Sequence, residues 1–181
     1  MTGNSRMSTQ PNTPYRVAFI HAPDPGYADT QNYGAKFMPV WAYTLAAHIP
    51  DDGRFVTSLY DCRFEPEEKI AEHDLFLFSG INQDSGNMEA VRARLEARYP
   101  NAKSMIGGPI CWSFDQADTL DMLNGFDHVF IGDGEEAISS LLEALRTGTP
   151  LEHVSRAKKR FAIADAQPFH KPMLDETVGR Y

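Results

Sequence analysis

The sequence predicts an α/β domain with a flavodoxin-like, doubly wound sheet of five parallel strands in the order 2-1-3-4-5. Five short apolar runs alternate with amphipathic segments, which is typical of parallel strands joined by right-handed crossover helices. Several of the runs are continuous, as in strands buried on both faces. A chain of 181 residues, 42% of them hydrophobic, is enough for one domain with a sizeable core.

The boundaries of the expected elements follow from apolar runs, helical spacing and turn residues. The expected strands are residues 16–21, 55–60, 74–79, 102–106 and 128–131. A helix is expected to begin at Pro39 and end at Pro50, because proline suits a first helical turn and stops a last one. The remaining expected helices are residues 66–73, 88–99, 115–125 with Asp115 as its cap, and 138–148 ending at Gly148.

Three regions are expected along the chain. The polar residues 1–14 form a disordered start, and residues 15–150 form the domain. Residues 151–181 contain Pro168 and Pro172 and show no core-forming helix, so we interpret them as an extension or linker.

Composition and charge exclude several classes of protein. The net charge of −8 argues against a nucleic-acid-binding face, and the short basic cluster from Arg156 to Arg160 is interpreted as solvated. No apolar run reaches the ~18 residues of a membrane span and the start lacks a secretion signal, so no membrane association and a cytoplasmic location are expected. Cys62 and Cys111 have neither zinc-site nor disulfide spacing, and no metal site is predicted.

Several catalytic motifs of this architecture are missing. His21-Ala22-Pro23-Asp24 follows the first strand in place of a G-x-G-x-x-G turn, and no phosphate-binding G-x-x-x-x-G-K-[ST] loop is present. Ser79-Gly80 lacks the hydrolase G-x-S-x-G elbow. The acidic and basic positions of a phosphorylation receiver hold His21, Ser79 and Gly132. No catalytic residue is therefore assigned.

Small and polar residues follow three of the expected strands. In an open parallel sheet the ligand crevice lies outside the carboxyl ends of the strands, and glycine permits close approach there. Free amides at the start of the last helix could meet a phosphate, while Glu135 could simply stabilise the helix dipole. The candidate ligand-binding residues at these ends are Ser79, Gly80, Ile81, Asn82, Gly107, Gly108, Pro109, Gly132, Asp133, Gly134 and Glu135.

Four segments carry a family resemblance: residues 37–46, 74–80, Ile106-Gly107-Gly108-Pro109 and 131–136. Over residues 16–146 the chain resembles the amino-terminal cobalamin-binding domain of cobalamin-dependent radical S-adenosylmethionine enzymes. The start of the helix at Pro39 also looks like the anaerobic magnesium-protoporphyrin ester cyclase branch. The resemblance implies that the glycine pair and the 132–135 turn line a slot for the dimethylbenzimidazole tail of cobalamin. Asp133 replaces the family's glutamate in that turn.

The resemblance also implies where the corrin ring lies. The first loop, residues 22–36, is longer than the usual ~2–6 residues, which is typical of a ligand-binding loop. The ring would lie over the strand ends and contact this region through Asn32, Tyr33, Met38 and Pro39. The D-x-H-x-x-G motif whose histidine ligates cobalt in other cobalamin domains is absent, so ligation by His21 in that manner is not supported.

The expected partner is a radical S-adenosylmethionine barrel domain, in cis or in trans. The sequence contains no C-x-x-x-C-x-x-C motif, so a [4Fe–4S] cluster and S-adenosylmethionine would have to be held by that barrel, which would act on a small-molecule substrate. Residues 167–181 are similar to the family's connector. Two alternatives stay open: a non-catalytic interaction or sensor module without cofactor, and an enzyme that binds a flavin or nucleotide in the same crevice.

Overall fold

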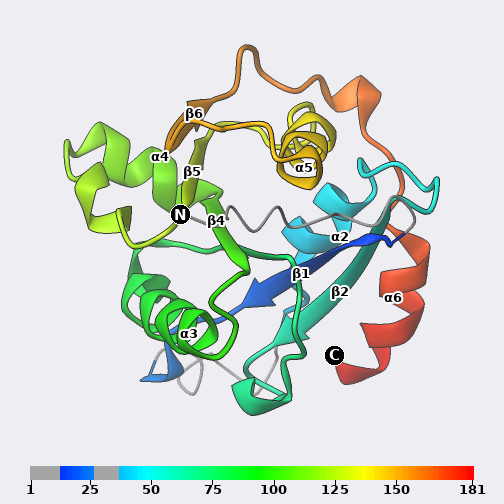
Figure 1. The fold of residues 1–181 in the computed structure, drawn as a ribbon, viewed down its shortest axis with the longest axis horizontal. Helices are drawn as coiled ribbons and strands as arrows, with labels where there is room; N and C mark the ends of the chain where they lie inside the picture. Colours follow the sequence, from blue (N-terminus) through cyan, green and yellow to red (C-terminus); the bar gives the residue numbers. More distant parts are fainter. Residues whose placement is uncertain (1–12, 27–36) are drawn as a thin grey trace, which may run out of the picture.

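A computed structural model describes residues 13–26 and 37–181. Its parallel sheet has six strands in the order β2-β1-β3-β4-β5-β6, which confirms the predicted fold class and strand order and adds a sixth strand at one edge (Figure 1). Most of the predicted disordered start lies outside the described residues. Asn32 and Tyr33 of the first loop also lie outside them. The strands are β1 (Tyr15–His21), β2 (Phe55–Asp61), β3 (Leu75–Ser79), β4 (Lys103–Gly107), β5 (His128–Ile131) and β6 (Val154–Arg156).

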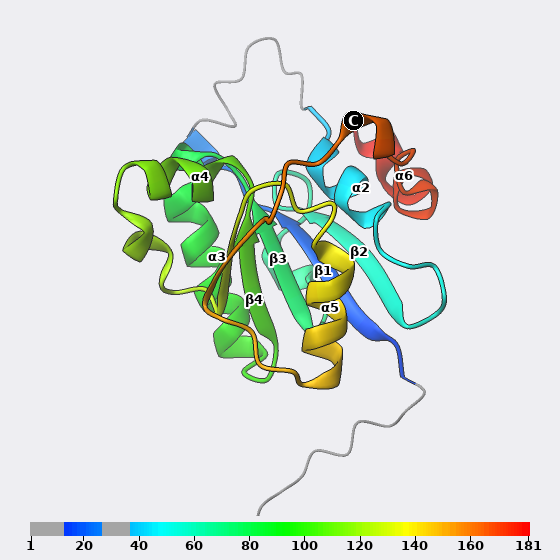
Figure 2. The ribbon, with the colours of Figure 1, turned by 90° about the horizontal axis from the view of Figure 1, so that it is seen from above.

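Helices cover both faces of the sheet (Figure 2). On one face, α3 (Ser85–Arg98) and α4 (Pro109–Gln116) bury their apolar sides, and on the other face α2 (Val40–Ala46), α5 (Ile138–Thr147) and α6 (Lys171–Thr177) do so. All five residues of β3 are buried, as its continuous apolar sequence predicts for a central strand. The short 3-10 turns are η2 (Glu67–Lys69), η3 (Asn82–Asp84), η4 (Leu120–Leu123), η5 (Ile163–Asp165) and η6 (Val178–Arg180).

The strand register brings polar and small residues together at one edge of the sheet. His21 at the end of β1 lies opposite Asp61 at the end of β2. Ser79 at the end of β3 lies opposite Gly107 at the end of β4. Because all the strands are parallel, their carboxyl ends form the edge at which a ligand crevice is expected.

The fourth helix begins earlier than predicted. We expected a helix from Asp115 to residue 125, but α4 starts at Pro109, directly after Gly108, and Asp115 lies in its last turn. Proline's fixed φ angle suits the first helical position, and this local signal determines the start. Asp118, with φ of 57°, follows the helix, and only the 3-10 turn η4 covers the rest of the predicted range.

Residues 151–181 contribute to the core, contrary to our expectation that no core-forming helix occurs there. Strand β6 pairs with β5, and Met173 of α6 is 2% exposed in the core beside α2. The Tyr43 hydroxyl lies 2.6 Å from the Thr177 hydroxyl. Helix α6 has only seven residues, so its buried positions are too few to form a recognisable periodic stripe.

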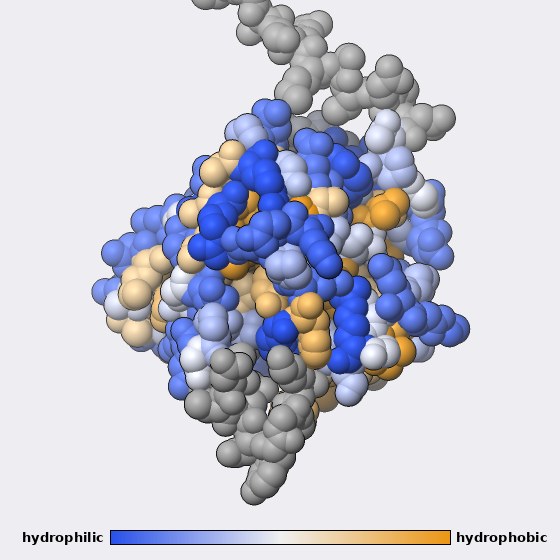
Figure 3. Space-filling view, turned by 90° about the horizontal axis from the view of Figure 1, so that it is seen from below, coloured by the Kyte–Doolittle hydropathy of each residue, from blue (hydrophilic) through white to orange (hydrophobic). Residues whose placement is uncertain are grey.

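The face shown in Figure 3 is mainly hydrophilic, with hydrophobic residues scattered among hydrophilic ones. Such scattered apolar residues are ordinary on a solvated surface. Among the described helices, none combines the length and apolar character needed to cross a membrane.

Candidate functional site

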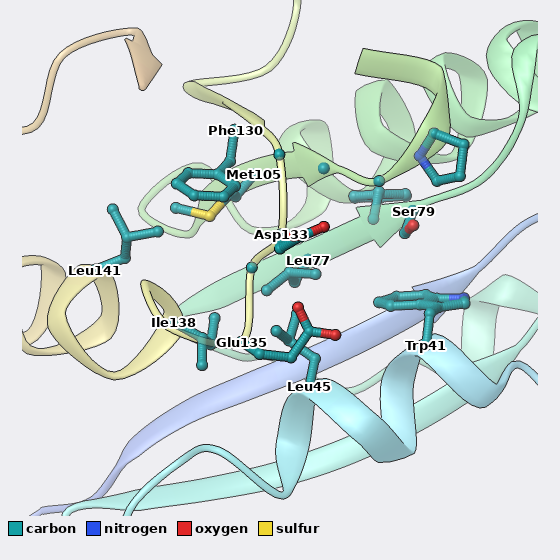
Figure 4. Close-up of a pocket in the computed structure, with 16 residues that line it drawn as sticks. Trp41, Leu45, Leu77, Ser79, Met105, Phe130, Asp133, Glu135, Ile138 and Leu141 are labelled. Carbon is teal, nitrogen blue, oxygen red and sulfur yellow. The ribbon is translucent and has the colours of Figure 1, made fainter. Parts of the chain in front are cut away.

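An apolar cavity of about 200 Å³, here called the inner cavity, lies between the sheet and helices α2 and α5 at the carboxyl ends of β3, β4 and β5 (Figure 4). Leu77, Met105 and Phe130 come from three neighbouring strands and face the helices. The cavity therefore presents a flat apolar wall to a ligand. Its lining is Trp41, Leu45, Leu77, Phe78, Ser79, Met105, Gly107, Gly108, Pro109, Phe130, Gly132, Asp133, Gly134, Glu135, Ile138 and Leu141.

The two glycines after β4 have different roles. A Cβ atom on Gly108 would lie 2.2 Å from the Ser79 Oγ, and Gly108 has φ of 83°, so both its neighbour and its backbone require glycine. A Cβ atom on Gly107 would find only the Phe130 carbonyl oxygen within 4 Å, at 3.7 Å. Gly107 and Met105 lie on the same side of β4, so the space beside Gly107 belongs to the inner cavity.

The turn after β5 is held by the segment that follows β6. Gly132 has φ of 111°, and a Cβ atom there would lie 2.6 Å from the Ala157 Cβ. The Phe161 amide donates to the Asp133 carboxylate at 2.8 Å, and Lys159 pairs with Glu136 at 2.9 Å. Residues 157–161 therefore fix the shape of one rim of the inner cavity.

The rim of the inner cavity carries two carboxylates. Figure 4 shows Asp133 and Glu135 projecting toward the space between α2 and the strand ends. The amides of Ala137 and Ile138 donate to the Gly134 carbonyl at 3.0 and 2.8 Å, so these two groups are already bonded within the turn. The start of α5 therefore offers fewer free amides for a phosphate than the sequence led us to expect.

A second space of about 390 Å³, here called the outer cavity, adjoins the inner one. It shares Trp41, Ser79 and Pro109 with the inner cavity, so the two spaces meet at these residues. Its lining is His21, Pro23, Phe37, Met38, Pro39, Val40, Trp41, Arg63, Ser79, Gly80, Ile81, Asp84 and Pro109.

A buried ion pair supports the outer cavity. Arg63 Nη2 lies 2.7 Å from an oxygen of Asp61, and the two side chains are 5% and 0% exposed. Tyr181 donates its hydroxyl to the same carboxylate at 2.9 Å, while Arg63 also donates to the Phe37 carbonyl at 2.7 Å. The network joins β2, the segment before α2 and the carboxyl-terminal residue.

The pKa values of the groups beside the outer cavity reflect this network. Burial alone would raise the pKa of Asp61, but hydrogen bonds from Arg63 outweigh it and the pKa lies below its ordinary value. Burial lowers the pKa of His21; the Asp61 carboxylate opposes this effect and the Arg63 guanidinium adds to it. His21 is therefore neutral near pH 7.

The predicted ligand-binding residues divide into three groups. Met38, Pro39, Ser79, Gly80, Ile81, Gly107, Gly108, Pro109, Gly132, Asp133, Gly134 and Glu135 line one or both cavities. Asn82 lies in η3 and lines neither cavity, while Asn32 and Tyr33 lie outside the described residues. Contact of any of these residues with a cofactor stays a prediction.

Sequence reasoning missed part of each cavity. Trp41 of α2 packs partly buried against the core and also forms a wall of both cavities. Apolar strand residues such as Met105 carry no signal that separates a cavity wall from a filled core. The pairing of Arg63 with Asp61 could have been suspected from their spacing of two residues, which lets a side chain fold back onto its neighbour.

The described residues contain no group of three or more His, Cys, Asp or Glu side chains placed to hold a metal ion. Cys62 and Cys111 are both free thiols, and burial raises the pKa of each to about 12. Neither thiol is therefore activated as a nucleophile or metal ligand.

Comparison with known proteins identifies the family. A search of curated proteins found no match. The family model described as B12 binding domain matches residues 28–142, more than half of the chain. That range contains the α2 wall, both glycine turns and the start of α5, which together form the inner cavity. The chain therefore belongs to the B12 binding domain family.

Proposed function

We propose that this chain is the cobalamin-binding part of a cobalamin-dependent radical S-adenosylmethionine enzyme, and that the inner cavity holds the dimethylbenzimidazole tail. The family match supports cobalamin as the cofactor. The main structural support is the inner cavity, an apolar space of about 200 Å³ at the strand ends. An apolar cavity of about 150 Å³ is enough to bind benzene, so this space suits a fused aromatic ring.

The chain's own residues would bind and orient the cofactor. The apolar side chains of Leu77, Met105 and Phe130 would face the tail, and Gly107 would leave room for it. The corrin ring would lie over the outer cavity, which Met38 and Pro39 line. When bound, cobalamin supplies methyl transfer or related radical-linked chemistry.

The radical part of the reaction would come from a barrel domain in cis or in trans that holds the [4Fe–4S] cluster and S-adenosylmethionine. Support comes from the resemblance of residues 106–109 and 131–136 and from the absence of the D-x-H-x-x-G motif, which such enzymes commonly lack. The substrate would be a small molecule. The likeness of the start of α2 to the cyclase branch is the feature that bears on the chemical class of this substrate. A cytoplasmic location stays a prediction.

The test is an anaerobic titration of the chain with hydroxocobalamin, followed by desalting and absorbance spectra. We expect retained cobalamin in its base-off form, because a tail held in the inner cavity cannot coordinate the cobalt. Gly107→Leu should fill the cavity without disturbing the fold and reduce retention at least tenfold. Gly86→Leu, at an exposed position of α3 with no atom near its Cβ, is the matched control and should bind as the unmodified chain does.

Two further ligands separate the alternatives. Cobinamide lacks the tail, so it should be retained less well than hydroxocobalamin and should be insensitive to Gly107→Leu. Retention of flavin mononucleotide in place of cobalamin would favour the flavin alternative, and retention of neither would favour the interaction module. Equal retention by Gly107→Leu and Gly86→Leu would contradict the proposed role of the inner cavity.

A further inference from the structure

Two residues that line the outer cavity each carry a buried ring nitrogen without a hydrogen-bond partner. In the part of the chain that the structure describes, three buried side-chain nitrogen or oxygen atoms lack a partner: His21 Nδ1, Trp41 Nε1 and His48 Nε2. The first two belong to residues that line the outer cavity. Leaving a buried polar group unpaired is unfavourable, because the group has lost its hydrogen bonds to water, and native interiors pair almost all such groups. A ligand with polar atoms in the outer cavity would supply the two missing hydrogen-bond partners.

The Trp41 side chain is held in place by its surroundings. The Trp41 ring packs against Phe19, with 5.7 Å between ring centroids. In Figure 4 the indole lies beside Ser79, with its nitrogen on the side away from Leu45 and Glu135. Trp41 thus stands where the inner and outer cavities meet, with its N–H turned away from the inner cavity's rim.

The chemistry of the two nitrogens specifies their partner. An indole N–H can only donate a hydrogen bond, whereas a neutral imidazole nitrogen without a proton can only accept one. Burial keeps His21 neutral by lowering its pKa, so with the proton on Nε2 its Nδ1 is an acceptor. A primary carboxamide offers a carbonyl acceptor and an N–H donor on adjacent atoms, and a carboxylate offers acceptors alone.

We propose that Trp41 and His21 recognise a primary carboxamide side chain on the edge of the corrin ring, Trp41 donating to its carbonyl oxygen and His21 accepting from its amide nitrogen. This inference rests on the proposed binding of cobalamin, whose corrin carries such carboxamides around its periphery. It makes the pair a selectivity device that distinguishes the amidated corrin from its partly amidated acid forms.

The first experiment follows the indole N–H directly. Trp112, which is 59% exposed on α4, is the only other tryptophan, so Trp112→Phe leaves a single indole signal. In ¹⁵N-labelled Trp112→Phe protein, hydroxocobalamin should shift the Trp41 N–H resonance downfield as its hydrogen bond forms. Replacement of Trp41 by its benzothiophene analogue, which keeps the ring and removes the donor, should weaken binding about tenfold. Trp112→Phe should bind with unchanged affinity.

The second experiment compares hydroxocobalamin with its separated monocarboxylic acids. One acid should bind about tenfold more weakly than the amide, and this ratio should fall toward one in His21→Phe. A ratio between two ligands is insensitive to a general loss of stability. Retention of hydroxocobalamin with an unshifted Trp41 resonance, and equal affinity for every acid, would overturn this inference alone. Failure of the unmodified chain to retain hydroxocobalamin would overturn the proposed function and the inference with it.

Discussion

The inner and outer cavities adjoin each other but are constructed differently. The inner cavity has an apolar wall of strand and helix side chains, and backbone turns at glycine give it its shape. The outer cavity is lined by Arg63 of a buried ion pair and by two residues with unpartnered ring nitrogens, His21 and Trp41. Trp41, Ser79 and Pro109 belong to both.

The difference indicates how each cavity can be damaged. A glycine turn responds to added volume, because neighbouring atoms already occupy the space around it. A buried ion pair responds to the loss of a charge, because the remaining charge then has no partner in a medium of low dielectric constant. Steric changes should therefore act mainly on the inner cavity, and changes of charge or pH on the outer one.

The largest loss of stability is expected from Arg63→Met. It leaves the fully buried Asp61 carboxylate with Tyr181 and a backbone amide but without its cation, and should lower the free energy of unfolding by about 3 kcal/mol. Arg54→Met is the matched control, because Arg54 forms exposed pairs with Asp52 and Glu143 that solvent screens, so its loss of stability should be much smaller. Urea unfolding measures both. Equal losses would show that burial of the Arg63 pair has no energetic consequence.

The next largest effect should distinguish the two adjacent glycines. Gly108→Ala forces a Cβ atom against the Ser79 Oγ and keeps a positive φ, so we expect a loss of about 2–3 kcal/mol in unfolding free energy. Gly107→Ala places its Cβ at ordinary contact distance and should lose less than about 1 kcal/mol.

A double variant separates the two causes at Gly108. Ser79→Ala removes the atom at 2.2 Å, so the Ser79→Ala, Gly108→Ala protein should recover the steric part of the loss while the φ strain persists. Stability measured for the two single variants and the double variant gives the coupling. Additive losses would mean that the Ser79 contact does not constrain Gly108.

The sequence was most informative where one local signal determines the structure. Apolar runs identified five of the six strands, and the pattern is clearest in β3, because a strand buried on both faces has no alternation to confuse it. Sequence reasoning failed for β6 and α6, which have three and seven residues. Their burial depends on the sheet and α2 already being in place. Asp115 resembled a helix cap, but it pairs with Arg156, 41 residues away.

The same contrast applies to the site. The glycine turns of the inner cavity were predictable, because they follow strands directly in the chain. The reason for the glycines was only partly predictable: Gly108 and Gly132 make room for Ser79 and Ala157 of the protein itself. The outer cavity depends on contacts such as that between Tyr181 and Asp61, 120 residues apart, which no local pattern reveals.

The smallest effect should appear as the contribution of His21, which lines the outer cavity, to the pH dependence of stability. Because burial lowers the pKa of His21 from its ordinary value of 6.5, the unfolded chain binds a proton near pH 6 that the folded chain does not. Stability should therefore fall as the pH drops from 7 to 5, by about 1.4 kcal/mol for each unit between the folded and unfolded pKa values. Asp61 acts in the same direction but only at lower pH, since its pKa lies below the ordinary carboxylate value.

His21→Gln should flatten the slope of stability against pH without abolishing it, because burial also lowers the pKa of His73. Leu141→Ala, in the inner cavity wall, should lower stability by the same amount at both pH values. Unfolding curves at pH 7 and pH 5 measure each slope, and an unchanged slope in His21→Gln would show that the outer cavity is no more sensitive to pH than the inner one.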